Sequence, residues 1–126
     1  MGLDNGIVLV SKGYDFDPPH PRGSYFEGEV EVCYWRKFWG FRNEVIEFFN
    51  QEKECEDIPL DWEDVYEIIL ILERFLDRDY FNTYGQSIWY YEDYLVHMIN
   101  DLENLRYLAN YLKENPKIEC YFYDSY

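Results

Sequence analysis

Three side chains suited to acid–base chemistry share one stripe of a predicted helix. Asp93, His97 and Asp101 follow one another at intervals of four residues, which places them on the same helix face. One carboxylate would orient the His97 imidazole for proton transfer, or a pair of these side chains would hold a metal ion. The two aspartates lie about 12 Å apart along a helix, so they cannot both bind one ion. A histidine between surface acids is usually structural, and an enzyme with a cleft near His97 and Asp93 is therefore the alternative hypothesis.

A run of acidic residues is the second candidate site. The chain carries 26 acids and 11 bases, a formal net charge of −15, and residues 44–79 hold 13 of these acids and 3 of the bases. On a helix, Glu63 and Glu67 form an i, i+4 pair. Glu52 and Glu56 form another if the preceding helix extends through them, and the side chains of such pairs are about 5–6 Å apart. That spacing is close to the step between phosphates along a nucleic-acid strand. The run predicts either a surface that mimics DNA charge or a solvated face that keeps the protein in solution.

Aromatic residues make up 21% of the chain and are the third group of candidate binding residues. Tyr90, Tyr94 and Tyr111 form a stripe beside the apolar face of the helix that carries His97, and this pattern fits either an interface or core. Arg36, Lys37 and Arg42 lie among aromatic residues, and we expect internal ion pairs or stacking on Trp there. The predicted binding residues are Glu52, Glu54, Glu56, Asp57, Glu63, Asp64, Glu67, Tyr90 and Tyr94.

Other kinds of chemistry are not indicated. Cys33, Cys55 and Cys120 are scattered, without the short spacing of a zinc site or the even number of a disulfide framework. We find no glycine-rich phosphate loop, nucleophile elbow or zinc-protease motif, and predict no cofactor and no metal. The negative charge argues against nucleic acid and anionic membranes as partners. The longest apolar run, residues 68–72, is far shorter than a membrane span. No signal peptide is recognised. We therefore expect a cytoplasmic protein.

The elements that position these residues follow from periodicity. Residues 7–10 and 118–122 have the apolar or alternating pattern of strands, and residues 29–33 begin as a strand. A first helix is predicted by the apolar face of Tyr34, Phe38, Phe41, Val45 and Phe48. A second helix is predicted over residues 62–76, with Asp61 as its N-cap, and a third over residues 87–114. Prolines and glycines make residues 15–28 a loop, and residues 51–58 and 79–86 are predicted connections. We expect one domain over residues 1–126, with an α+β fold of three main helices on a small antiparallel sheet formed by the N- and C-terminal strands.

Four segments in order carry a resemblance over the whole chain. They are Met1-Gly2-Leu3-Asp4, Tyr34-Trp35-Arg36-Lys37, Trp89-Tyr90-Tyr91-Glu92-Asp93 and Phe122-Tyr123-Asp124-Ser125-Tyr126. Together they resemble a family of small uncharacterised proteins from phages and mobile elements of Gram-positive bacteria. The resemblance implies a setting of phage and host and no particular reaction.

These observations lead to one functional hypothesis. We expect a small acidic protein of a phage or mobile element that binds a host protein with a basic surface. Its specific form is inhibition of a nucleic-acid-binding or defence protein by mimicry of DNA charge. The alternatives are the enzyme near His97 and a structural, self-associating module, with a homo-oligomer left open.

Overall fold

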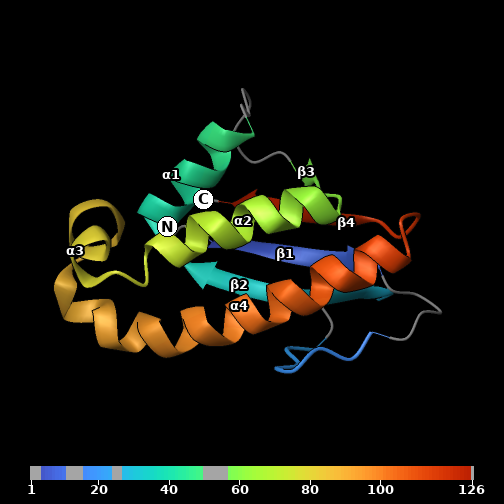
Figure 1. Cartoon of the computed structure of the whole chain (residues 1–126), viewed down its shortest axis with the longest axis horizontal. Helices are drawn as coiled ribbons and strands as arrows, with labels where there is room; N and C mark the ends of the chain where they lie inside the picture. Colours follow the sequence, from blue (N-terminus) through green and yellow to red (C-terminus); the bar gives the residue numbers. More distant parts are fainter. Residues whose placement is uncertain (1–3, 11–15, 24–26, 50–56, 126) are drawn as a thin grey trace.

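The α+β fold is confirmed in a computed structural model that describes residues 4–10, 16–23, 27–49 and 57–125. Four strands form one antiparallel sheet in the order β2-β1-β4-β3. Their bounds are β1 Asp4–Val10, β2 Glu29–Arg36, β3 Ile58–Pro59 and β4 Cys120–Ser125. The helices α1 (Trp39–Phe48), α2 (Trp62–Arg74) and α4 (Tyr91–Glu114) lie on one face of the sheet (Figure 1). The predicted pairing of the first and last strands is confirmed, with Ile7 of β1 opposite Phe122 of β4.

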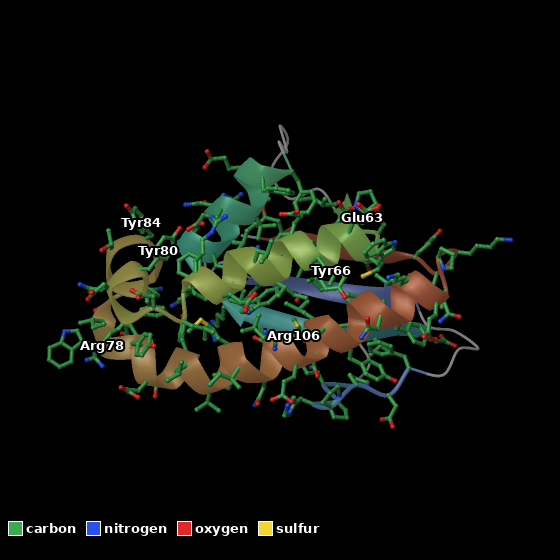
Figure 2. All side chains as sticks on the ribbon, viewed as in Figure 1. Glu63, Tyr66, Arg78, Tyr80, Tyr84 and Arg106 are labelled. Carbon is green, nitrogen blue, oxygen red and sulfur yellow. The ribbon has the colours of Figure 1, made fainter. Side chains whose placement is uncertain are left out.

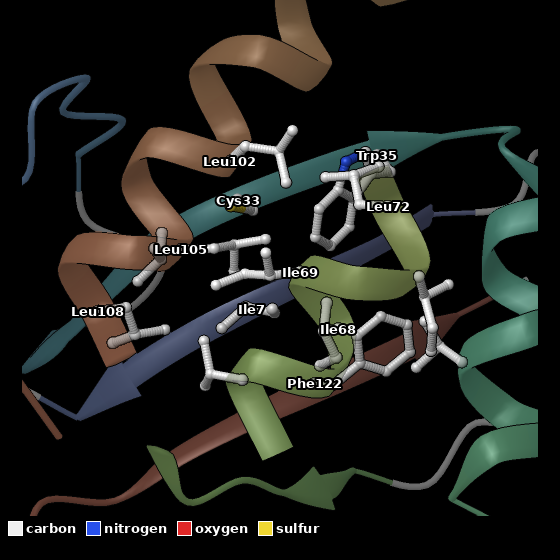
Figure 3. Close-up of a cluster of buried hydrophobic side chains, with 14 of the residues drawn as sticks. Ile7, Cys33, Trp35, Ile68, Ile69, Leu72, Leu102, Leu105, Leu108 and Phe122 are labelled. Atoms are coloured by element: carbon white, nitrogen blue, oxygen red, sulfur yellow. The ribbon is translucent and has the colours of Figure 1, made fainter. Parts of the chain in front are cut away.

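Alternation along β1 divides its side chains between the two faces of the sheet. Ile7 and Leu9 belong to the core cluster under the helices, where side chains of α2 and α4 meet over the strands (Figure 3). Val8, between them, is fully buried but lies outside that cluster. Because successive strand residues point to opposite faces, Val8 belongs to the face that the three long helices leave open.

Tyrosines cover this open face. The Tyr121 hydroxyl reaches Glu29 at 3.1 Å, and the Tyr123 hydroxyl donates to Glu31 at 3.0 Å. Both glutamates are on β2 and both tyrosines on β4, so each ring crosses the central strand β1. Gly6 permits this, since a Cβ there would lie 2.5 Å from the Tyr123 ring. A layer of tyrosine and carboxylate groups therefore shields Val8 from solvent.

Helix α2 begins as predicted. The Asp61 carboxylate accepts the Asp64 backbone N–H at 2.8 Å, and the Asp64 carboxylate accepts the Asp61 N–H at 3.0 Å. This reciprocal capping box satisfies backbone donors that the first helical turn leaves open. Its apolar face packs on α4, and Arg106 of α4 bridges the two helices by an ion pair with Glu73 at 3.3 Å (Figure 2).

The first helix begins later in the structure than the sequence pattern predicts. Tyr34 and Arg36 belong to β2, an eight-residue strand of which seven residues pair with β1, and α1 starts at Trp39. Phe48, expected in the core, is 50% exposed. β3 was not predicted. The predicted loop over residues 79–86 contains the end of a short helix, α3 (Arg78–Tyr80), and a π-helical turn, η1 (Phe81–Gly85); a 3-10 turn, η2 (Ile88–Tyr90), then leads into α4.

Two close contacts tie α1 to the rest of the fold. A Cβ at Gly40 would lie 1.7 Å from the Tyr84 carbonyl oxygen, so the absence of a side chain lets α1 approach η1. Two residues on, the Arg42 guanidinium is buried against Asp124 of β4, with Nη2 2.7 Å from Oδ2. Asn5 of β1 donates to the same carboxylate at 2.7 Å. No helix in the described ranges is long and apolar enough to cross a membrane.

Candidate functional site

A pocket of about 630 Å³ lies between the end of β2 and the first turns of α4. Four consecutive residues, 34–37, form its β2 side, and Tyr94, His97 and Met98 form its α4 side. Gln86, Tyr90, Phe38 and Arg22 complete the lining. Segments that are distant in the sequence therefore meet at one cavity, and residues 34–37 and Tyr90 come from two of the segments that carry the family resemblance.

Backbone geometry and two side-chain tethers shape the β2 side of this pocket. Lys37 has a φ of 56°, the left-handed region that residues with a side chain rarely adopt. The chain therefore leaves the strand direction directly after Arg36. The Tyr94 hydroxyl donates to the Arg36 carbonyl at 2.9 Å, and the Gln86 side-chain amide donates to the Lys37 carbonyl. These bonds hold the strand end against η1 and α4.

Two cations at the pocket have no carboxylate partner among the described residues, in a chain of net charge −15. Arg36 and Lys37 are exposed, and within the described residues neither forms an ion pair. The other five arginines each lie within 4.0 Å of a carboxylate: Arg22, Arg42, Arg74, Arg78 and Arg106. The expected internal pairing is thus confirmed for Arg42, whereas Arg36 and Lys37 form no ion pair among the described residues.

Beside the pocket lies a buried carboxyl group. The Asp101 side chain is 1% exposed, and its oxygens have no hydrogen-bond partner among the described residues. Burial raises the pKa of Asp101 to about 7, although the Arg22 guanidinium, the Trp35 indole and Cys33 favour the ionised form. Arg22 Nη2 lies 3.6 Å from Asp101 Oδ1. A group that titrates near neutral pH therefore adjoins the cavity, an arrangement frequent at functional sites.

Arg22 is positioned by the loop over residues 16–23. The Asn104 side chain of α4 accepts the His20 backbone N–H at 2.9 Å and donates to the His20 and Val32 carbonyls at 2.9 and 3.1 Å. The Gly23 carbonyl accepts the Glu31 N–H at 3.1 Å, with Gly23 at a φ of 97°. The loop is thereby fixed to both α4 and β2, and Arg22 reaches the space between the pocket and Asp101.

The predicted acid–base stripe is not assembled. His97 is exposed and lines the pocket, Asp93 is exposed outside its lining, and Asp101 is buried. In the part of the chain that the structure describes, no hydrogen bond or ion pair joins His97 to either aspartate, and no group of three His, Cys, Asp or Glu side chains is arranged to hold a metal. Among the residues that the structure describes, His97 therefore has no partner that would orient it for proton transfer.

The predicted acidic surface and its tyrosines are separate. Glu52, Glu54 and Glu56 lie outside the described residues. Asp57 is exposed before β3, where partial burial and the charge of Glu29 raise its pKa. Glu63 lies at the start of α2 (Figure 2), Asp64 is engaged in the capping box, and Glu67 is half-buried on the same helix. Tyr90 and Tyr94, in contrast, line the cationic pocket.

Sequence reasoning missed Arg22, Gln86 and the pairing of Arg22 with Asp101. One signal was available for the cationic side: residues 34–43 contain three bases and no acid, a local reversal of charge. No family model, curated protein or solved structure matches the chain.

Proposed function

We propose that the protein binds a small anionic ligand with an aromatic ring in the pocket between β2 and α4. The observation that carries this proposal is the pairing pattern of the arginines. In an acid-rich chain, Arg36 and Lys37 meet at a cavity without a carboxylate partner among the described residues. An anion would supply that partner, and an arginine fork binds carboxylate, sulfonate or phosphate oxygens in pairs.

The size and aromatic lining of the pocket indicate the rest of the ligand. A volume of about 630 Å³ is typical of small-molecule sites. The Tyr90 ring is 52% exposed and packs against no other ring in the described ranges. Tyr94 packs edge-on against Phe38 at 5.0 Å between centroids and presents its remaining surface to the cavity. These faces favour a planar ring over a bare inorganic ion.

Isothermal titration calorimetry with three probes tests this proposal. Naphthalene-1-sulfonate has both ring and anion, methanesulfonate lacks the ring, and 1-naphthalenemethanol lacks the charge. We expect binding of the first and at least tenfold weaker binding of the other two, because each lacks one class of contact. Arg36→Gln and Lys37→Gln should each weaken naphthalene-1-sulfonate binding about tenfold, a value typical of one charge-assisted hydrogen bond.

Lys117→Gln is the matched control, since Lys117 is exposed and lies outside the pocket lining. It removes the same charge from the whole protein but should leave the affinity unchanged. Equal losses in all three variants would show that net charge alone governs binding, and no binding to the wild-type protein would refute the proposal.

A second candidate is the binding of a host protein through an acidic, aromatic surface, placed on the open face of the sheet. Glu29 and Glu31 lie there with Tyr121 and Tyr123, and the Tyr34 hydroxyl donates to Asp4 at 2.6 Å. Carboxylates beside tyrosine rings complement arginine side chains, which pair with the former and stack on the latter. An arginine-rich segment of a nucleic-acid-binding protein has that chemistry. The buried, unpaired thiols of Cys33 and Cys120 suit the cytoplasm, where such a host protein would be met.

Binding of a nona-arginine peptide tests this second candidate. We expect affinity that falls steeply with salt and that drops in the double variant Glu29→Gln/Glu31→Gln. The control Glu63→Gln/Glu67→Gln removes two acids from α2 and should bind as the wild type does. A larger loss of peptide affinity in Glu63→Gln/Glu67→Gln than in Glu29→Gln/Glu31→Gln would assign the binding surface to α2 instead.

A further inference from the structure

Arg22 belongs to two environments at once. Its side chain lines the pocket, and its Nη2 atom is 3.6 Å from the buried Asp101 carboxylate. The side chain is 28% exposed, so it is only partly fixed by its surroundings. At 3.6 Å the contact is longer than the 2.7 Å between Arg42 and Asp124. An anion in the pocket therefore competes with Asp101 for the same guanidinium.

We infer that anion binding in the pocket draws Arg22 away from Asp101 and is thereby coupled to the uptake of one proton by the Asp101 carboxylate. This inference rests on the proposed ligand-binding function. A buried carboxylate that loses its cation is destabilised in the charged form. It regains stability by taking a proton from solvent, which leaves a neutral carboxyl group beside the occupied pocket.

The groups around Asp101 offer no equivalent replacement for Arg22. His20 and Arg22 approach it from the loop, and Cys33 and Trp35 approach it from β2. Burial and the neighbouring Asp101 raise the pKa of the Cys33 thiol, so Cys33 stays neutral. The His20 ring contacts Glu103 at 3.5 Å. On α4 itself, His97 lies one turn before Asp101 and lines the pocket, where it faces the ligand.

Calorimetry in buffers of different ionisation enthalpy measures the protons taken up on binding. Naphthalene-1-sulfonate is the probe, because its sulfonate does not titrate near neutral pH. At pH 8 the wild-type protein should take up close to one proton for each probe bound. Its affinity should fall as the pH rises above 7, by up to tenfold per pH unit, the limit for one linked proton.

Asp101→Asn should bind the probe with no proton uptake from this site and with an affinity that is nearly constant above pH 7. His97→Gln is the matched control, since it removes a titratable group from the pocket lining and leaves the Arg22–Asp101 pair intact. It should keep the proton uptake of the wild type. Proton uptake that persists in Asp101→Asn and disappears in His97→Gln would assign the coupling to the histidine and overturn the inference.

A ligand-free measurement tests the same coupling independently. Arg22→Gln imitates the withdrawal of the guanidinium, so the pKa of Asp101, followed by carbon NMR of its carboxyl group, should rise above the wild-type value. An unchanged pKa would overturn the inference while leaving the proposed function intact. No probe binding to the wild type, in contrast, would overturn both.

Discussion

The buried ion pair between Arg42 and Asp124 offers a sharp test of how this fold is stabilised. Asp124 is 3% exposed and accepts three close contacts: Arg42 Nη2 at 2.7 Å, Arg42 Nε at 3.1 Å and Asn5 Nδ2 at 2.7 Å. The substitution Asp124→Ala removes the acceptor of all three. Arg42, which is 7% exposed, then loses its bidentate carboxylate.

The expected cost follows from that burial. Removing one partner of a buried ion pair typically costs about 3–5 kcal/mol, because the remaining charge keeps its desolvation penalty. A domain of 126 residues has a free energy of unfolding of about 6–19 kcal/mol at the usual 0.05–0.15 kcal/mol per residue. The substitution should therefore remove a large fraction of the stability. Arg42→Met/Asp124→Leu, which removes both charges, should recover part of the loss.

Urea unfolding followed by circular dichroism measures these differences. The matched control is Glu92→Ala, which breaks a 3.4 Å ion pair with Arg78 whose side chains are 62% and 76% exposed. Exposed pairs contribute about 0–1 kcal/mol, so the control should change the unfolding midpoint little. A loss below about 1 kcal/mol in Asp124→Ala, or a loss equal to that of the control, would refute the reasoning.

Three further predictions concern packing, capping and pH. Gly40→Ala should destabilise the protein by about 1–3 kcal/mol in urea unfolding, because the new methyl group would meet the Tyr84 carbonyl. This change usually stabilises the interior of a helix, so a gain in stability would show that the close contact with Tyr84 does not exist. Asp61→Ala should cost about 1 kcal/mol through loss of the capping box with Asp64, which thermal unfolding would show as a midpoint a few degrees lower. Burial raises the pKa of Asp101 from 3.8 to about 7 in the folded protein. The folded state therefore binds this proton more tightly than the unfolded state does. The contribution of Asp101 to the free energy of unfolding is complete below pH 4 and is lost as the pH rises through 7. Over that range the loss is about 4 kcal/mol at 1.36 kcal/mol per unit, and Asp101→Asn should abolish this dependence in unfolding measured from pH 4 to 8.

The helices α2 and α4 could be predicted from the sequence because local rules agree there. The apolar residues of α2 recur at helical spacing, and Asp61 and Asp64 mark its start. The start of α1 was predicted wrongly for an equally physical reason. Tyr34 and Phe38 are four residues apart, as on a helix face, yet Tyr34 is in a strand whose pairing with β1 outweighs that local pattern.

The pocket could not be predicted because its parts are far apart in the chain. Arg22 and Asp101 are separated by 79 positions, and Asn104 fixes the loop that brings them together. No local spacing encodes such a contact. Tyr90 and Tyr94 are predicted binding residues together with the acids of residues 52–67, whereas the structure places both tyrosines beside Arg36 and Lys37.

The loop over residues 16–23 also bears on aggregation. β2 is an outer strand of the sheet, and unpaired outer strands can recruit a strand from another molecule. Here the Glu31 N–H is bound by Gly23, the Val32 carbonyl by Asn104, and the Arg36 carbonyl by Tyr94. These groups are occupied within the molecule, so further copies of the chain cannot extend the sheet along this edge without first breaking native hydrogen bonds. The loop and the tyrosine that shape the pocket between β2 and α4 therefore also protect the protein from polymerising through β2.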